Sequence, residues 1–215
     1  MRLGLADPEE FAPAERRPAS SPRTVGYLAR ICPEKGFHRL VDAFIRLRSD
    51  PRFSDVRLRA GGWLGKDDRV FYREQRSKLS AAGLEDAFDH VALEDRAAKI
   101  RFLQGLDVFS VPTTYAEPKG LFVLEALAAG VPAVLPAHGC FPELIDDLGG
   151  ARLVAPDDDE ALVAALCALL HDDPERRRLG EEGRRGVVER GNAGVAARDT
   201  LDVWRRVAAA ESLER

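Results

Sequence analysis

The sequence has few of the residues that metal centres and disulfide frameworks require. Its 215 residues include three cysteines and four histidines. Cys32, Cys140 and Cys167 are far apart and lack metal-ligand spacing, and the histidines form no local cluster. We therefore expect no metal. An odd number of scattered cysteines suits a reducing compartment, which predicts a cytoplasmic protein.

Long apolar runs and an excess of basic charge are also missing. No apolar stretch approaches the ~20 residues of a membrane-spanning helix, so no transmembrane segment is predicted. The opening MRLGLADPEEF has no signal-peptide core. The chain has 36 acidic and 32 basic residues, a net charge of -4, which argues against a nucleic-acid partner. With 45% hydrophobic and 32% charged residues, it is typical of soluble globular proteins.

What the sequence does contain is a repeated alternation of short apolar runs and segments with helical spacing. Such alternation indicates βαβ units and a parallel sheet. We predict an α/β fold with a Rossmann-like parallel sheet of about six strands and helices on both faces. The strands are expected within 23–31, 56–62, 89–94, 107–114, 132–138 and 151–156.

The two ends of the chain differ from this pattern. Residues 1–23 hold four prolines among charged and small residues, which predicts a linker or tail and not a core element. The Rossmann-like domain is expected over 24–190 and a C-terminal helix over 191–215. We expect Trp204 to anchor that helix, and the Arg and Glu residues from Pro174 onward to form a solvated face.

The predicted topology brings two loops together. Ligands of open α/β sheets bind at the carboxyl ends of the strands, where the strand order reverses. In the order 3-2-1-4-5-6 this point lies between the first and fourth strands. The loops CPEKGFHR and YAEPKG follow these strands. Arg30 and Lys35 should therefore lie beside Glu117, Gly120 and Glu125.

These residue types indicate a nucleotide sugar. Two cations and the free N–H groups of a helix that begins after Gly120 fit a diphosphate. The carboxylates of Glu117 and Glu125 are good acceptors for sugar and ribose hydroxyls. The absence of a GxGxxG pattern disfavours an ordinary NAD enzyme. Simpler interpretations stay open, since the cations and Glu117 could be ordinary loop charges and Glu125 could pair with a lysine.

Two segments also resemble a known family. GYLARICPEKGFHRLVDAF and YAEPKGLFVLEALAAGVPAVLPAHGCFPELI are similar to the C-terminal domain of group 1, or family 4, retaining glycosyltransferases of the GT-B fold. Glu117 and Glu125 match the E-x7-E signature of that family. The resemblance runs from about Thr24 to Glu189 and implies a single GT-B half.

The resemblance implies a role for each matching residue. Arg30 and Lys35 would grip the diphosphate of a nucleoside-diphosphate sugar, the donor substrate, without metal or other cofactor. Glu117 would contact the transferred sugar and act with these cations in catalysis, and Glu125 would hold the ribose. Backbone groups of Gly120, Leu121 and Phe122 would face the donor. Lys119 replaces the family's usual aromatic residue, so it either adds a donor contact or is simply exposed.

The family's enzymes have two such domains, and this chain has length for one. We therefore expect the donor-binding half of a retaining glycosyltransferase, which transfers a glycosyl group to an acceptor hydroxyl when completed by a missing N-terminal GT-B domain. One alternative is a non-catalytic nucleotide-sugar-binding or interaction module that docks on a separate chain through its last helix. Another is a related GT-B epimerase. No motif fixes the base, the sugar, the acceptor or the oligomeric state.

Overall fold

The protein is built around one six-stranded parallel sheet. The computed structural model describes residues 3–13 and 21–213. The strand order is β3-β2-β1-β4-β5-β6, and every neighbouring pair is parallel. This confirms the predicted fold class and strand order. The strands are β1 (Thr24–Leu28), β2 (Arg57–Gly61), β3 (Phe88–Val91), β4 (Val108–Ser110), β5 (Ala133–Pro136) and β6 (Ala151–Val154).

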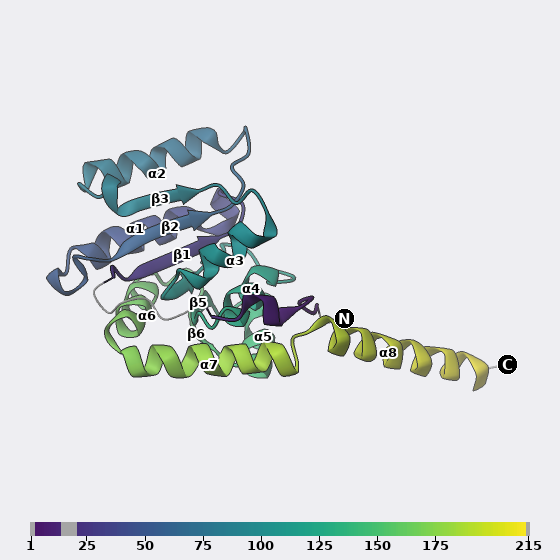
Figure 1. Ribbon diagram of the computed structural model, residues 1–215. Helices are drawn as coiled ribbons and strands as arrows, with labels where there is room; N and C mark the ends of the chain where they lie inside the picture. Colours follow the sequence, from purple (N-terminus) through teal and green to yellow (C-terminus); the bar gives the residue numbers. More distant parts are fainter. Residues whose placement is uncertain (1–2, 14–20, 214–215) are drawn as a thin grey trace.

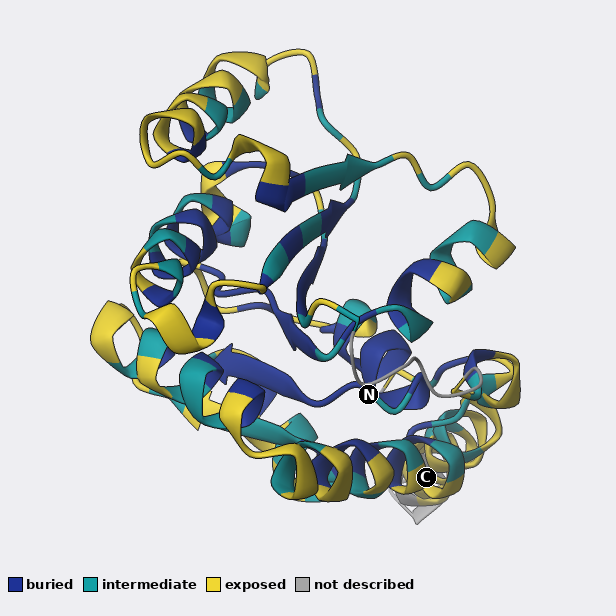
Figure 2. Cartoon of the chain, turned by 60° about the vertical axis from the view of Figure 1, so that its left-hand side comes forward, coloured by how far each residue is buried: buried dark blue, intermediate teal, exposed yellow. Residues whose placement is uncertain are grey.

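Helices cover both faces of the sheet (Figures 1 and 2). Helix α1 contacts α2 and α6 on one face, and α7 contacts α4 and α5 on the other. The helices are α1 (Phe37–Arg48), α2 (Arg69–Ala81), α3 (Arg96–Gln104), α4 (Leu121–Ala128), α5 (Phe141–Leu148), α6 (Asp159–His171), α7 (Asp173–Glu189) and α8 (Ala193–Leu213). Four short 3₁₀ helices are η1 (Pro8–Phe11), η2 (Pro33–Lys35), η3 (Pro51–Phe53) and η4 (Glu85–Ala87).

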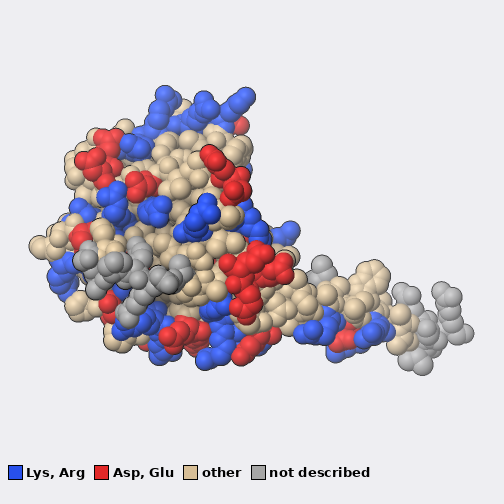
Figure 3. All heavy atoms as spheres, viewed as in Figure 1, with Lys and Arg blue, Asp and Glu red and all other residues tan. Residues whose placement is uncertain are grey.

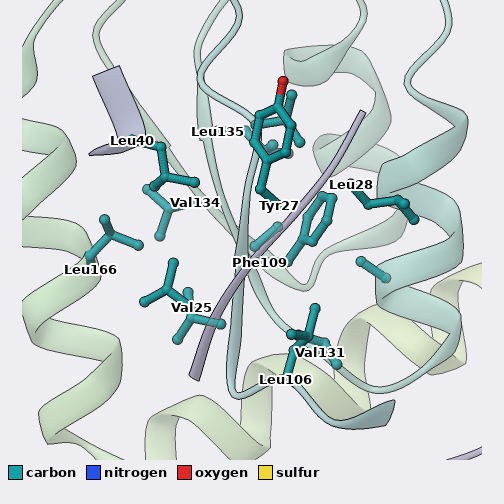
Figure 4. Packing of buried hydrophobic residues seen from close by; sticks show 14 of the residues in the cluster. Val25, Tyr27, Leu28, Leu40, Leu106, Phe109, Val131, Val134, Leu135 and Leu166 are labelled. Atoms are coloured by element: carbon teal, nitrogen blue, oxygen red, sulfur yellow. The ribbon is translucent and has the colours of Figure 1, made fainter. Parts of the chain in front are cut away.

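The central strand β1 is buried on both faces, as a strand between two helical layers must be. Successive side chains point to opposite faces. Tyr27 packs edge-on against Phe37 of α1, with ring centroids 5.1 Å apart. On the other face a side chain at Gly26 would overlap Leu106, whose methyl carbon lies 2.1 Å from the position of a Cβ. Figure 4 shows buried side chains from β1, β4 and β5, among them Tyr27, Phe109 and Val134, packed together in the core.

The N-terminal segment differs from the expected tail. Residues 3–13 pack on the body: Leu5 and Phe11 are buried, and Leu5 forms a parallel bridge with Asn192. Glu9 forms an ion pair with Arg184 of α7. The expectation of no core element is therefore wrong for this part, because two apolar side chains among the prolines reach the core. Residues 14–20 lie outside the described residues, and the domain limits themselves stay predictions.

The last helix projects away from the body (Figure 1). Trp204 is 71% exposed, so the expectation that it anchors α8 is wrong for the described part of the chain. Leu201, Val203 and Val207 are exposed as well. On the face shown in Figure 3, acidic and basic side chains are interspersed, with basic ones gathered over α2. None of the helices within the described residues combines the length and apolarity needed to cross a bilayer.

Candidate functional site

The loops after β1 and β4 pack against each other, as the topology predicted. The Thr114 N–H donates to the Glu34 carbonyl over 3.0 Å. Gly36 adopts φ +69°, and a Cβ at this position would lie 1.7 Å from the Pro112 carbonyl oxygen. Only glycine allows this approach in a left-handed conformation. The contact brings residues 33–36 against residues 112–114, and it places Lys35 at the start of the second loop.

A closed cluster of three side chains lies where the loops meet. The Lys35 ammonium is 2.5 Å from Glu117 Oε2 and donates to the Tyr115 hydroxyl over 2.5 Å. The Tyr115 hydroxyl in turn donates to Glu117 Oε2 over 2.7 Å. We call these residues the Lys35–Tyr115–Glu117 triangle. It joins positions 82 residues apart in the sequence, so the fold brings together one predicted cation and one predicted acid.

The environment of the triangle shifts the pKa of both charged groups toward the charged form. Burial alone raises the pKa of Glu117, but hydrogen bonds from Lys35 and Tyr115 outweigh it, and the net pKa is lowered. Burial likewise lowers the pKa of Lys35, but its bonds to Glu117 and Tyr115 leave that pKa raised. Both shifts favour the charged forms of the pair.

Glu117 also faces the N-terminus of α4. Its Oε1 is 3.3 Å from the Lys119 N–H nitrogen and 3.4 Å from that of Gly120. Gly120 has φ +65° and precedes the first helical residue, Leu121, which is exposed. The first N–H groups of a helix have no partner within it and attract negative charge. The helix mouth is therefore suited to an anion, and Glu117 lies beside it.

The turn after β5, residues 138–140, packs against the loop that carries Glu117. The Cys140 N–H donates to the Glu117 carbonyl over 2.8 Å. Gly139 has φ +60°, and a Cβ there would meet the Glu117 backbone at 2.4 Å. His138 Nε2 lies 3.0 Å from the Thr113 carbonyl and 3.2 Å from its hydroxyl. The turn after β5 thus fixes the backbone that carries Glu117.

Glu125 lies one turn into α4 and is only 6% exposed. It forms an ion pair with Lys99 of α3, whose side chain is partly exposed. A buried carboxylate needs such compensation. The structure therefore shows the lysine pairing that the sequence left open. The Lys99 side chain is 28% exposed, so it reaches solvent beside Glu125.

The other predicted residues lie around this centre with looser contacts. Arg30 is exposed, and its guanidinium contacts Cys32 Sγ at 3.2 Å and Glu34 at 3.5 Å. The structure does not bring Arg30 into contact with Glu117. Phe122 is half-buried, with its ring centroid 5.5 Å from the Lys35 ammonium. Lys119 is exposed and lines a cavity of about 350 Å³ between α4 and α5.

Sequence reasoning missed three contributors. Tyr115 lies two residues before Glu117, and its position in the same loop was the available signal. Lys99 lies in the middle of α3, and nothing in its local sequence indicates its partner. His138 belongs to a quoted motif but had no assigned role. Across residues 3–13 and 21–213, no group of three or more His, Cys, Asp and Glu side chains is placed to hold a metal ion.

Comparison with known proteins identifies the family. The family model described as "Glycosyl transferases group 1" matches residues 8–186, most of the chain. The chain belongs to the group 1 glycosyl transferases. Its sequence is 32% identical over 213 residues to the MMP alpha-(1->4)-mannosyltransferase of Mycolicibacterium hassiacum, which covers 96% of this chain. The chain spans 48% of the length of that relative, so this group 1 chain corresponds to about half of it.

Solved structures show the same fold. The crystal structure of the C-terminal domain of a group 1 glycosyl transferase from Francisella tularensis aligns with a TM-score of 0.78 and 24% identity, covering 88% of this chain and all of that domain. Anabaena HepE in complex with UDP and glucose aligns with a TM-score of 0.80 and 18% identity, covering 94% of this chain and 55% of HepE. The group 1 chain therefore has the fold of a GT-B C-terminal domain.

Proposed function

We propose that this chain is the donor-binding half of a retaining glycosyltransferase and that its donor is a nucleoside-diphosphate sugar. The observation that carries the proposal is the meeting of Lys35 and Glu117, 2.5 Å apart, at the switch point of the sheet. Family membership supports a glycosyl donor, and HepE binds UDP and glucose on the same fold.

The roles follow from the chemistry of each group. Lys35 binds the diphosphate together with Arg30, which swings from its exposed position on the same loop. The first N–H groups of α4, from Gly120 to Phe122, face the phosphates or the sugar. Glu117 accepts hydrogen bonds from the transferred sugar, and Lys119 lies at the rim of the site.

At the other end of the site, Glu125 binds the ribose hydroxyls after Lys99 retreats to solvent. Transfer breaks the bond between the anomeric carbon and the diphosphate oxygen, forms one between that carbon and the acceptor oxygen, and passes the acceptor's proton to the departing diphosphate. The cations and helix N–H groups then stabilise the negative charge that develops on the departing diphosphate, so no metal is needed for that step. The acceptor binds mainly to the N-terminal domain, which is outside this chain.

Titration calorimetry tests the proposal. UDP, GDP and ADP are titrated into the folded chain, and one of them should bind with little glycosyl transfer. Lys35→Met should weaken the diphosphate by about tenfold or more, as loss of a charged hydrogen bond predicts, and leave the nucleoside unchanged. Lys78→Met is the matched control, since Lys78 pairs with Asp42 across α1 and α2, outside the site. Failure of all three nucleotides to bind at millimolar concentration would overturn the proposal.

One observation favours a second candidate, a non-catalytic module that binds a nucleotide sugar and docks on a separate chain. Helix α8 exposes Leu201, Trp204 and Val207 at helical spacing, and an exposed apolar stripe of this kind fits a protein partner. Adding a separately produced N-terminal half distinguishes the two functions. The first predicts glycosyl transfer on assembly, and the second predicts assembly without transfer.

A further inference from the structure

The residue proposed to bind the diphosphate is already engaged in the structure. All the strong contacts of the Lys35 ammonium lie within the triangle: Glu117 Oε2 at 2.5 Å and the Tyr115 hydroxyl at 2.5 Å. The rings of Tyr115 and Phe122 lie 5.0 Å and 5.5 Å from the same nitrogen. An ammonium has three donors, and Glu117 and Tyr115 accept from two of them. A diphosphate that draws on more than the one remaining donor must therefore displace one of these partners.

Loss of the Lys35 ion pair is unfavourable for the Glu117 carboxylate. Its side chain is 6% exposed, and a buried carboxylate without a partner is costly. If Lys35 turns toward a phosphate, the remaining contacts are the Tyr115 hydroxyl at 2.7 Å and two long contacts at the mouth of α4. The Tyr115 hydroxyl is thus the one short side-chain bond that keeps Glu117 satisfied while Lys35 moves.

We propose that, within the Lys35–Tyr115–Glu117 triangle, Glu117 competes with the donor diphosphate for the Lys35 ammonium. Binding transfers the Lys35 ammonium from Glu117 to a phosphate oxygen, and Tyr115 is the positioning residue that holds the Glu117 carboxylate toward the sugar. The inference rests on the proposed function. It implies that Glu117 lowers the affinity for nucleoside diphosphates, although the same carboxylate accepts hydrogen bonds from the transferred sugar.

The direct test measures the affinity of the nucleoside diphosphate that the wild-type chain binds. Glu117→Gln frees Lys35 and should tighten this ligand by about tenfold, the size expected for loss of one charged hydrogen bond. Tyr115→Phe removes the bond that keeps Glu117 satisfied when Lys35 moves, so it should weaken this ligand by about threefold. Glu85→Gln is the matched control: Glu85 of η4 pairs with Arg76 of α2, beside the edge strand β3 and away from the site, and the affinity should not change.

A double substitution separates competition from simple repulsion between Glu117 and the phosphates. In a Lys35→Met background, Glu117→Gln should give no gain if it acts by releasing Lys35. The same tenfold gain in that background would overturn the inference. Failure of the wild-type chain to bind any nucleoside diphosphate would instead overturn the proposed function.

A second measurement needs no ligand. The amine of Lys35 is acylated at pH 8.5, and the modified peptide is quantified by mass spectrometry. Release from Glu117 lowers the pKa of Lys35, so Glu117→Gln should accelerate its acylation several-fold, whereas Glu85→Gln should not. An unchanged rate in Glu117→Gln would show that Lys35 is not held by Glu117, and it would overturn the inference even where the Lys35→Met variants bind too weakly to compare.

Discussion

Replacing Gly36 with alanine should destabilise the protein far more than the same replacement at Gly83. The two glycines have nearly the same backbone conformation, with φ +69° and +68°. A Cβ at Gly36 would lie 1.7 Å from the Pro112 carbonyl oxygen, whereas nothing lies within 4 Å of a Cβ at Gly83. The Gly83 variant therefore measures backbone strain alone, and the difference between the variants measures the contact between the two loops.

The magnitudes follow from these two situations. An alanine in the left-handed region costs ~1–2 kcal/mol, and the stiffer unfolded chain offsets ~0.4–1 kcal/mol of this. Gly83→Ala should therefore lower the free energy of unfolding by about 1 kcal/mol. At Gly36 both clashing atoms belong to the backbone, so no rotamer change relieves the overlap. Forcing the loops apart adds ~1–3 kcal/mol, for a total of about 2–4 kcal/mol.

Urea unfolding followed by far-ultraviolet circular dichroism gives both values. Calorimetry then shows whether the loop contact matters for the site: Gly36→Ala should weaken nucleoside diphosphate binding, because it moves Lys35 away from the N-terminus of α4, and Gly83→Ala should not. Equal losses of stability in the two variants, within about 0.5 kcal/mol, would refute the claim that the loops meet at Gly36.

Three further predictions concern buried charges. Lys99→Ala should lower the free energy of unfolding by ~1–3 kcal/mol and by more than Glu125→Gln, because it strands a buried carboxylate; urea unfolding that ranks the two variants in the opposite order would contradict this. Glu117 has a lowered pKa and Lys35 a raised one, so each charged group stabilises the folded state. This stability should be lost as the pH falls through the folded pKa of Glu117 and as it rises through that of Lys35. Urea unfolding of Glu117→Gln should show no loss of stability on the acid side. Burial, and then the Glu117 carboxylate, raise the pKa of Cys140 to about 11, so iodoacetamide should label it slowly at neutral pH and faster toward pH 11; rapid labelling of the folded chain at neutral pH would contradict this.

The strand order and the meeting of the two loops were predictable because they depend on pattern and topology. Buried parallel strands are short apolar runs, and the helices between them have a different period. The start of α1 at Phe37 is harder to predict. It depends on Gly36, whose left-handed conformation ends the 3₁₀ turn and starts the helix directly, and the local sequence does not reveal that conformation.

Features that depend on distant partners were not predictable. Phe11 lies among prolines that indicate a tail, yet it is fully buried against the body. Lys99 pairs with Glu125 because α3 and α4 are neighbours in space, and no spacing records this. Trp204 is a large aromatic residue of the kind that usually anchors a helix. It is exposed because, within the described residues, no other element packs against this part of α8. In each case the decisive information lies in tertiary contacts.

In the proposed function, the two buried carboxylates favour a whole nucleotide sugar over a bare anion. Glu117 and Glu125 are each almost fully buried, and each is neutralised by a lysine that is more exposed than its partner. An anion that takes Lys35 leaves Glu117 short of hydrogen bonds, so pyrophosphate alone gains a cation at the cost of a poorly satisfied carboxylate. A nucleotide sugar supplies the diphosphate for the cation, and hydroxyls from the sugar and the ribose for the two acids. The two ion pairs would thus make the proposed site select for a ligand that carries both kinds of group at once.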